Sequence, residues 1–243
     1  MSILTSVQYS VFSNNRIEPT PNVVSDMLSE LNAMSKYTFI PSMIIGKNID
    51  LLAEKVNPIN NISFVTIDQQ VRIACMNERI DVEINGTQSN QTIPIEEHIG
   101  FARCALSKIM QQNHIYSNRL AININLLSDC IEDPIQDSSL GRKLCNTLDF
   151  YNGAFLEEWS SRVNSRRPIQ IDDTELLNVI TELSSVLDSA TGKKRFLCHM
   201  DINTIFENAG YRFSFGSLEK FDSEVIKIIT EIKRNFEEVN NGQ

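Results

Sequence analysis

Three short segments of alternating apolar and polar residues lie side by side between Asn61 and Asn85, and they constrain the fold more than any other feature. Their apolar positions are Ile62 and Phe64, then Val71, Ile73 and Cys75, then Ile80, Val82 and Ile84. Such alternation is typical of strands with one buried face, and the short polar breaks between the segments predict tight turns. The region therefore predicts a three-stranded antiparallel meander. Its polar face carries Arg72, Arg79, Asp81 and Glu83.

The rest of the first half adds strands and helices of recognisable period. Strands are predicted at Val7–Phe12, at Leu120–Leu126, and at Tyr37–Ile45, where Pro41 restricts the strand to a sheet edge. Thr20-Pro21 is typical of a helix start and precedes an apolar stripe at helical spacing. A second helix is predicted from Pro94 to Gln112, with two glutamates in its first turn.

The second half contains two segments that fit more than one structure. Phe155–Val163 fits a strand or a helix, and Glu175–Leu187 has apolar residues at both spacings. Arg195–Ile205 predicts a strand, and Ser217 begins a long final helix. Each half thus contains strands followed by a long amphipathic helix. We expect an α+β fold with antiparallel β-meanders packed against long amphipathic helices. Two similar β-then-α halves are one possible arrangement of these elements.

The length of 243 residues suits one globular unit. A subdivision into 1–128 and 139–243 is also possible, because the stretch 129–138 is acidic and polar, contains Pro134, and is typical of a linker.

Charge and cysteine content indicate the compartment and the partner class. The chain has 22 basic and 31 acidic residues, and this net charge of −9 disfavours generic nucleic-acid binding. The negative charge is distributed unevenly, since the net charge is −2 up to Ala121 and −7 after it. The sequence contains five cysteines without close pairs, and its N-terminus lacks the pattern of a signal peptide, so we expect a cytoplasmic protein. It also lacks an apolar run of about 20 residues, so we expect no membrane segment.

One cluster has residue types that catalysis uses. In Cys198-His199-Met200-Asp201, a strand would place His199 and Asp201 on one face, where the carboxylate could orient the imidazole for general-base chemistry or a metal site. The alternative is a structural histidine beside an acid on a half-buried strand. No catalytic, phosphate-binding or metal-binding motif accompanies the pair, so we predict no catalytic residue, no metal and no cofactor.

Basic residues gather in two places despite the acidic composition. These residues are Arg162, Arg166 and Arg167 in one segment, and Lys193, Lys194 and Arg195 at a predicted turn. They are candidates for an anion-binding edge that takes phosphate, nucleic acid or an acidic partner. The alternative is ordinary solubilising charge at strand ends and loop tips.

The final helix has an apolar stripe that fits either a core or an interface. Its members are Leu218, Phe221, Val225, Ile228, Ile232 and Phe236. Spacings of three and four residues are typical of core packing, and they also suit contact with a partner or a second copy.

The segments Phe196–Asn203 and Ile228–Glu238 resemble the ending of a sporadically distributed group of uncharacterised bacterial proteins of about 250 residues. In that group a strand with an Asp-Ile-Asp-like step precedes a long helix that ends in a Phe-Glu pair. Asn203 departs from the group's pattern, where an acid is common. The resemblance implies an α+β protein of the bacterial cytosol, encoded on mobile or defence-related islands, with no assigned catalytic residues.

These observations favour a non-enzymatic interaction protein, such as a regulatory subunit of a larger bacterial assembly, whose partner is another protein or a second copy. One alternative is a metal-dependent hydrolase or nuclease that uses acidic residues, with His199 and Asp201 as the first candidates. Another alternative is a phosphate- or nucleic-acid-sensing module that uses the basic edge.

Overall fold

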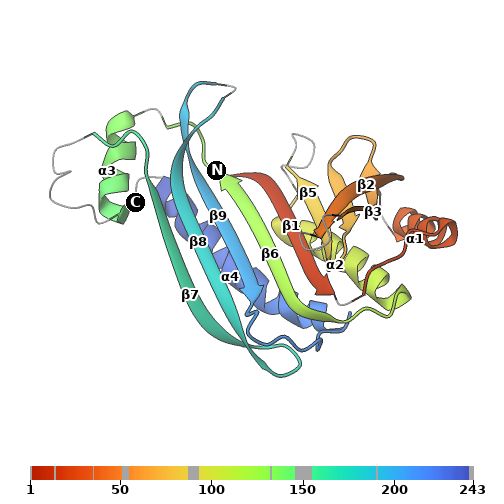
Figure 1. Cartoon of the computed structure of the whole chain (residues 1–243). Helices are drawn as coiled ribbons and strands as arrows, with labels where there is room; N and C mark the ends of the chain where they lie inside the picture. The colour runs from red at the N-terminus through yellow and green to blue at the C-terminus, as the bar shows by residue number, and fades with distance from the viewer. Residues whose placement is uncertain are drawn as a thin grey trace.

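The computed structural model describes residues 2–13, 15–34, 36–50, 55–86, 93–131, 133–145, 155–189 and 191–240, with the backbone alone for 46–50, 55–60, 134, 136, 145 and 240. The described residues form a nine-stranded antiparallel sheet and four helices (Figure 1). The strands are β1 (Ile3–Ser13), β2 (Phe39–Asp50), β3 (Lys55–Thr66), β4 (Val71–Cys75), β5 (Arg79–Asn85), β6 (Ser117–Leu127), β7 (Ser160–Gln170), β8 (Thr174–Leu187) and β9 (Lys194–Thr204). The helices are α1 (Pro21–Met34), α2 (Ile95–Gln112), α3 (Pro134–Cys145) and α4 (Ser217–Asn240).

The order of the strands is β2-β3-β4-β5-β1-β6-β9-β8-β7. At the centre, β1 pairs with β6 so that Tyr9 lies opposite Ile122, and β6 pairs in turn with β9. Strands from before and after the predicted linker therefore belong to one continuous sheet. The linker itself is only partly irregular, because α3 begins at Pro134.

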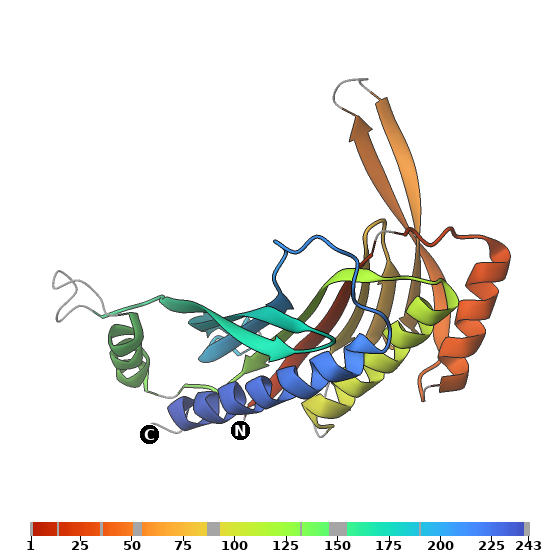
Figure 2. The ribbon, with the colours of Figure 1, turned by 90° about the horizontal axis from the view of Figure 1, so that it is seen from below.

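The core lies between one face of the sheet and the helices. Figure 2 shows α2 and α4 side by side on the same face. On α4, the side chains of Leu218, Phe221 and Val225 are fully buried in this core. The ring of Phe221 lies 5.9 Å from the ring of Tyr9 on β1. Ile228 and Phe236 are also buried, and Ile232 is partly buried against the same cluster. The apolar stripe of the final helix thus packs in the core of this chain.

The α+β class and the antiparallel meander are confirmed by this arrangement. Glu175–Leu187 is a strand, since β8 pairs with β7 on one side and β9 on the other, with Leu177 and Val179 buried. In the segment Phe155–Val163, β7 begins only at Ser160. Among the helices described, none combines the length and the apolar character needed to cross a bilayer.

A buried carboxyl group lies inside this core. Asp222 of α4 is 5% exposed, and its Oδ2 lies 3.2 Å from Nε of Arg103 on α2. Burial raises the pKa of Asp222 to about 7, although Tyr9 and Arg103 act in the opposite direction. Burial, followed by the charge of Asp222, also raises the pKa of Tyr9.

This carboxyl makes stability depend on pH. Between about pH 4 and pH 7 the unfolded chain ionises Asp222 while the folded chain keeps its proton, so stability falls as the pH rises through this window. Asp222→Asn removes that loss. We expect the free energy of unfolding of this variant, relative to the wild type, to increase from pH 4 to pH 7 and then level off.

Urea denaturation at several pH values measures this difference. Asp26→Asn, at an exposed position of α1, is the matched control for the loss of a carboxylate. If the free energy of unfolding of Asp222→Asn differs from that of the wild type by the same amount from pH 4 to pH 8, the buried group does not titrate as expected.

Candidate functional site

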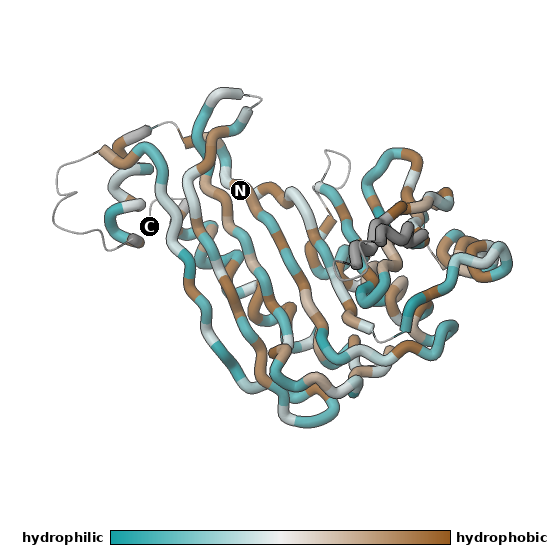
Figure 3. The backbone as a smooth tube through the Cα atoms, viewed as in Figure 1, coloured by the Kyte–Doolittle hydropathy of each residue, from teal (hydrophilic) through white to brown (hydrophobic). Residues whose placement is uncertain are grey.

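The face of the sheet opposite α2 and α4 carries polar side chains, and in the described part of the chain no helix covers it (Figures 1 and 2). Figure 3 shows the cause, since hydrophilic and hydrophobic residues alternate along the central strands. Alternate side chains point to opposite faces of a strand, so the apolar set meets the helices and the polar set faces away from them. We call this second surface the open face.

Strand register arranges the open face in rows that cross the sheet. One row runs through Ser6, Asn125, His199, Glu182 and Arg162 on β1, β6, β9, β8 and β7. The next row contains Gln8, Asn123 and Asp201. The third row contains Ser10, Ala121, Asn203, Asn178 and Arg166. Five carboxamide side chains from four strands thus meet on the central part of the open face.

Hydrogen bonds hold several of these side chains in place. His199 donates from Nδ1 to Oδ1 of Asn125 over 2.8 Å, and Nδ2 of Asn125 donates to Oγ of Ser6 over 2.9 Å. In the neighbouring row Nδ2 of Asn203 donates to Asp201 over 2.7 Å, and Nδ2 of Asn178 reaches Asn203 at 3.4 Å. The open face is therefore an ordered array of donors and acceptors.

A shallow hollow of about 230 Å³ lies on the β1–β5–β4 side of the open face. Its charged lining consists of Arg72, Arg79, Asp81 and Glu83, together with Gln8. Asp81 accepts a hydrogen bond from Ser10 Oγ at 2.6 Å, and its Oδ2 forms an ion pair with Arg79, whose Nε lies 2.9 Å away. Opposite charges balance within the hollow, so it attracts neither polyanions nor polycations strongly.

The segment 205–216, which joins β9 to α4, borders the open face at one end. Figure 2 shows it rising on the side away from the helices. Glu207 of this segment forms a 2.7 Å ion pair with Arg166, which belongs to the third row. The loop therefore reaches over the edge of the array and limits its extent.

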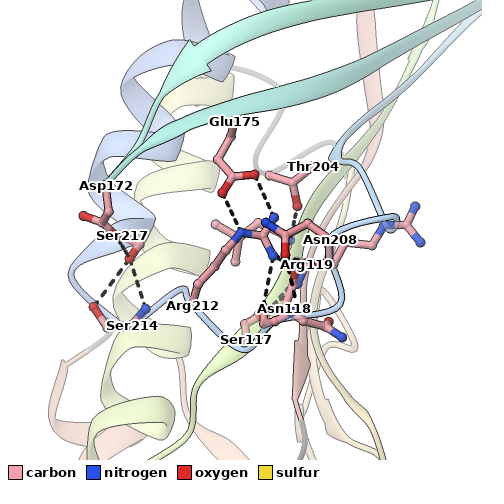
Figure 4. A network of polar contacts seen from close by, with 12 residues as sticks. Ser117, Asn118, Arg119, Asp172, Glu175, Thr204, Asn208, Arg212, Ser214 and Ser217 are labelled. Atoms are coloured by element: carbon pink, nitrogen blue, oxygen red, sulfur yellow. Dashed lines mark hydrogen bonds and ion pairs between the residues drawn. The ribbon is translucent and has the colours of Figure 1, made fainter.

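Arg212 anchors this loop, as Figure 4 shows. Its guanidinium makes two hydrogen bonds to the buried carboxylate of Glu175, at 2.5 and 2.7 Å. It also donates to the backbone oxygens of Asn118, Asn208 and Gly210. One side chain thus ties the loop to the beginnings of β6 and β8. Arginine suits this position because its planar guanidinium can donate to several oxygen acceptors at once.

The candidate catalytic pair lies on the open face, but its two members have separate partners. His199 bonds to Asn125 and Asp201 bonds to Asn203, and in the described residues no hydrogen bond joins His199 to Asp201. The described residues also contain no group of three or more histidine, cysteine or acidic side chains that could hold a metal ion. Cys198 points to the helix side, where burial raises its pKa to about 12.

The predicted basic residues are spread over different surfaces. Arg162 and Arg166 lie on the open face of β7, whereas Arg167 lies on the other face and pairs with Glu231. Lys193, Lys194 and Arg195 lie at the β8–β9 turn, where Lys194 contacts the buried Asp137 at 2.9 Å and Arg195 contacts Asp188 at 2.8 Å. Ion pairs with acids thus hold Arg166, Arg167, Lys194 and Arg195, and the structure does not bring the six candidates together.

Our sequence reasoning missed the central amides of the open face. Gln8, Asn123, Asn125 and Asn203 are polar members of alternating segments, which was the available signal. Their proximity depends on the strand order, which the alternation does not encode.

No protein-family model matches this chain, and no curated protein sequence matches it significantly.

Loss of the Arg212 anchor should destabilise the fold. Arg212→Ala leaves the carboxylate of Glu175, which is 7% exposed, without its cation, and we expect a loss of about 3 kcal/mol in the free energy of unfolding. Arg212→Lys keeps the charge without the fork and should lose less. Chemical denaturation of the three proteins measures this order, and equal stabilities would contradict the anchoring role.

Proposed function

We propose that this chain is a non-catalytic cytoplasmic binding subunit that holds a partner protein against the open face of its sheet. The observation that carries the proposal is the ordered array of amides and balanced charges on a sheet face that no described helix covers. A buried face of a sheet requires apolar residues, so a polar face of this size is built to contact water or a polar surface.

The chemistry of the open face favours a protein over a polyanion. Carboxamides offer both donors and acceptors, which match the mixed polar groups of a protein surface. Its acids and arginines are close to balance, and the chain's net charge of −9 repels phosphate backbones. The support for binding rather than catalysis is that His199 and Asp201 are each bonded to an asparagine.

Preorganisation adds to this support. The hydrogen bonds from His199 to Asn125 and from Asn125 to Ser6 restrict these side chains before a partner arrives. Side chains already fixed lose less conformational entropy on binding, so an array of this kind gains affinity without large apolar contacts.

The proposal includes a two-part architecture of similar β-then-α halves. The strand order supports it, because β5, β4 and β3 follow outward from β1 as β9, β8 and β7 follow outward from β6. Along the chain, α1 follows β1 and α2 follows β5 in the first half. In the second half, α3 follows β6 and α4 follows β9. The open face would then consist of two related surfaces that meet along β1 and β6.

The proposal also places the chain as a regulatory subunit of a larger bacterial assembly, with a role in defence or on mobile elements. This part rests on the resemblance of Phe196–Asn203 and Ile228–Glu238 to the group described above.

A matched pair of variants tests the open face. Asn123→Lys places a long charged side chain at its centre, and Gln111→Lys makes the same chemical change on the exposed side of α2. We expect recovery of the partner from the native host to fall at least ten-fold with Asn123→Lys and to stay at the wild-type level with Gln111→Lys. Affinity purification at moderate salt with quantitative mass spectrometry measures both.

Two results would contradict the proposal. One is equal recovery of every co-purifying protein by the two variants. The other is turnover of a substrate by the purified chain that is lost in His199→Ala/Asp201→Ala while the melting temperature is unchanged, which would favour the enzyme alternative.

A further inference from the structure

Beyond the third row, a fourth row crosses the open face at the end of the sheet that the 205–216 loop borders. It consists of Arg79 on β5, Phe12 on β1 and Arg119 on β6, since Phe12 lies opposite both arginines. The guanidinium carbon of Arg119 lies 5.0 Å from the centre of the Phe12 ring, and that of Arg79 lies 5.9 Å from it. One aromatic ring thus contacts a cation from each neighbouring strand.

The two arginines differ in their partners. Arg79 forms the ion pair with Asp81 described above. No ion pair joins Arg119 to an acid of the described chain, and its Nε is shielded from solvent without a hydrogen-bond partner. A shielded N–H that lacks an acceptor costs free energy, so the position calls for an acceptor that the chain itself does not supply.

Hydrogen bonds fix the backbone around Arg119. The buried Oγ of Ser117 accepts from the backbone N–H of Phe12 at 3.1 Å and from that of Arg119 at 3.2 Å. The pairing of β1 with β6 skips Asn118 at this point, which is a bulge of the kind that re-aims side chains. The carbonyl of Asn118 is one of the acceptors of the Arg212 anchor. Arg119 is therefore held in position before any ligand arrives.

The side chain of Arg119 is directed to the open face. Its place in the register puts it on the same face as Ala121 and Asn123. In Figure 4 it points away from the contacts of Arg212 with Glu175. Its guanidinium is thus available to a molecule that docks on the open face.

The acids that border this part of the open face are already paired. Asp81, opposite Ser10, pairs with Arg79, and Glu207 of the loop pairs with Arg166. An anion for Arg119 therefore comes from another molecule.

The charge of the site suits a single carboxylate. Arg79 and Arg119 are positive and Asp81 is negative, so the group has one positive charge left for a ligand. A planar guanidinium binds a carboxylate through two parallel hydrogen bonds. Phosphate has a similar geometry, but it adds up to two negative charges beside Asp81, in a chain of net charge −9. A carboxylate is therefore the better match.

We propose that Arg119, stacked on Phe12, binds the carboxylate of an aspartate or glutamate side chain of the partner protein. This inference rests on the proposed function, because it places that protein on the open face, and it adds the chemical group that the protein presents there. A charge-assisted, two-bonded contact has a defined direction, so it fixes the orientation of the partner on rows that otherwise carry amides.

A glutamate analogue tests the site on the isotope-labelled full chain. N-acetylglutamate amide carries one carboxylate, and N-acetylglutamine amide has the same shape without the charge. In NMR titrations we expect the Nε–Hε signal of Arg119 to shift saturably with the first compound and to stay in place with the second. Arg119→Gln should raise the dissociation constant at least ten-fold. Arg234→Gln, the same change at an exposed position of α4, should leave it unchanged.

Three results of these titrations would overturn the proposal. One is an Arg119 signal that does not move with the glutamate analogue, a measurement that needs no variant. Another is an equal shift with the glutamine analogue. The third is tighter binding of inorganic phosphate than of the glutamate analogue at Arg119, which would assign the site to phosphate.

Affinity purification from the native host separates this inference from the proposed function. Arg119→Gln should lower recovery of the protein that Asn123→Lys loses, by at least ten-fold, with an unchanged melting temperature. If Asn123→Lys lowers recovery and Arg119→Gln does not, the carboxylate contact is wrong and the open face still binds its partner. If neither variant lowers recovery, both proposals are wrong.

Discussion

The pairing of β1 with β6 is the contact on which the rest of the structure depends. It joins two strands more than a hundred residues apart and aligns Val7, Tyr9 and Val11 with Ile124, Ile122 and Leu120. This aligned apolar surface receives α2 and α4, which contact each other beneath it. The same register aligns Ser6 and Gln8 with Asn125 and Asn123 on the other side. One pairing thus creates both the core and the open face.

The local elements of this fold were predictable because their periodicity is strong. The meander from Asn61 to Asn85, the helix over Pro94–Gln112 and the strand at Leu120–Leu126 have a single dominant period, and each occurs within a few residues of its predicted bounds. Glu175–Leu187 had both periods, and local preference could not decide between them. The decision came from β7 and β9, whose hydrogen bonds satisfy both edges of β8.

The candidate site was predictable only in fragments. The shared face of His199 and Asp201 followed from alternation along one strand, and the charged face of the meander followed in the same way. The contact of His199 with Asn125 is set by the position of β9 beside β6, which is a long-range choice. The basic residues show a related limit. Their clustering in sequence gave no sign that four of them would form ion pairs with Asp137, Asp188, Glu207 and Glu231.

The position of β6 in the sheet has a consequence for synthesis on the ribosome. Its first neighbour, β1, is made before it, so pairing on that side can form as soon as Leu127 emerges. Its second neighbour, β9, begins only at Lys194, roughly 70 residues later, which takes several seconds at ordinary translation rates. During that interval the nascent chain presents a complete strand edge at the centre of its future sheet. The free edge of β6, which is made in the first half of synthesis, is therefore covered only when β9 of the second half pairs with it.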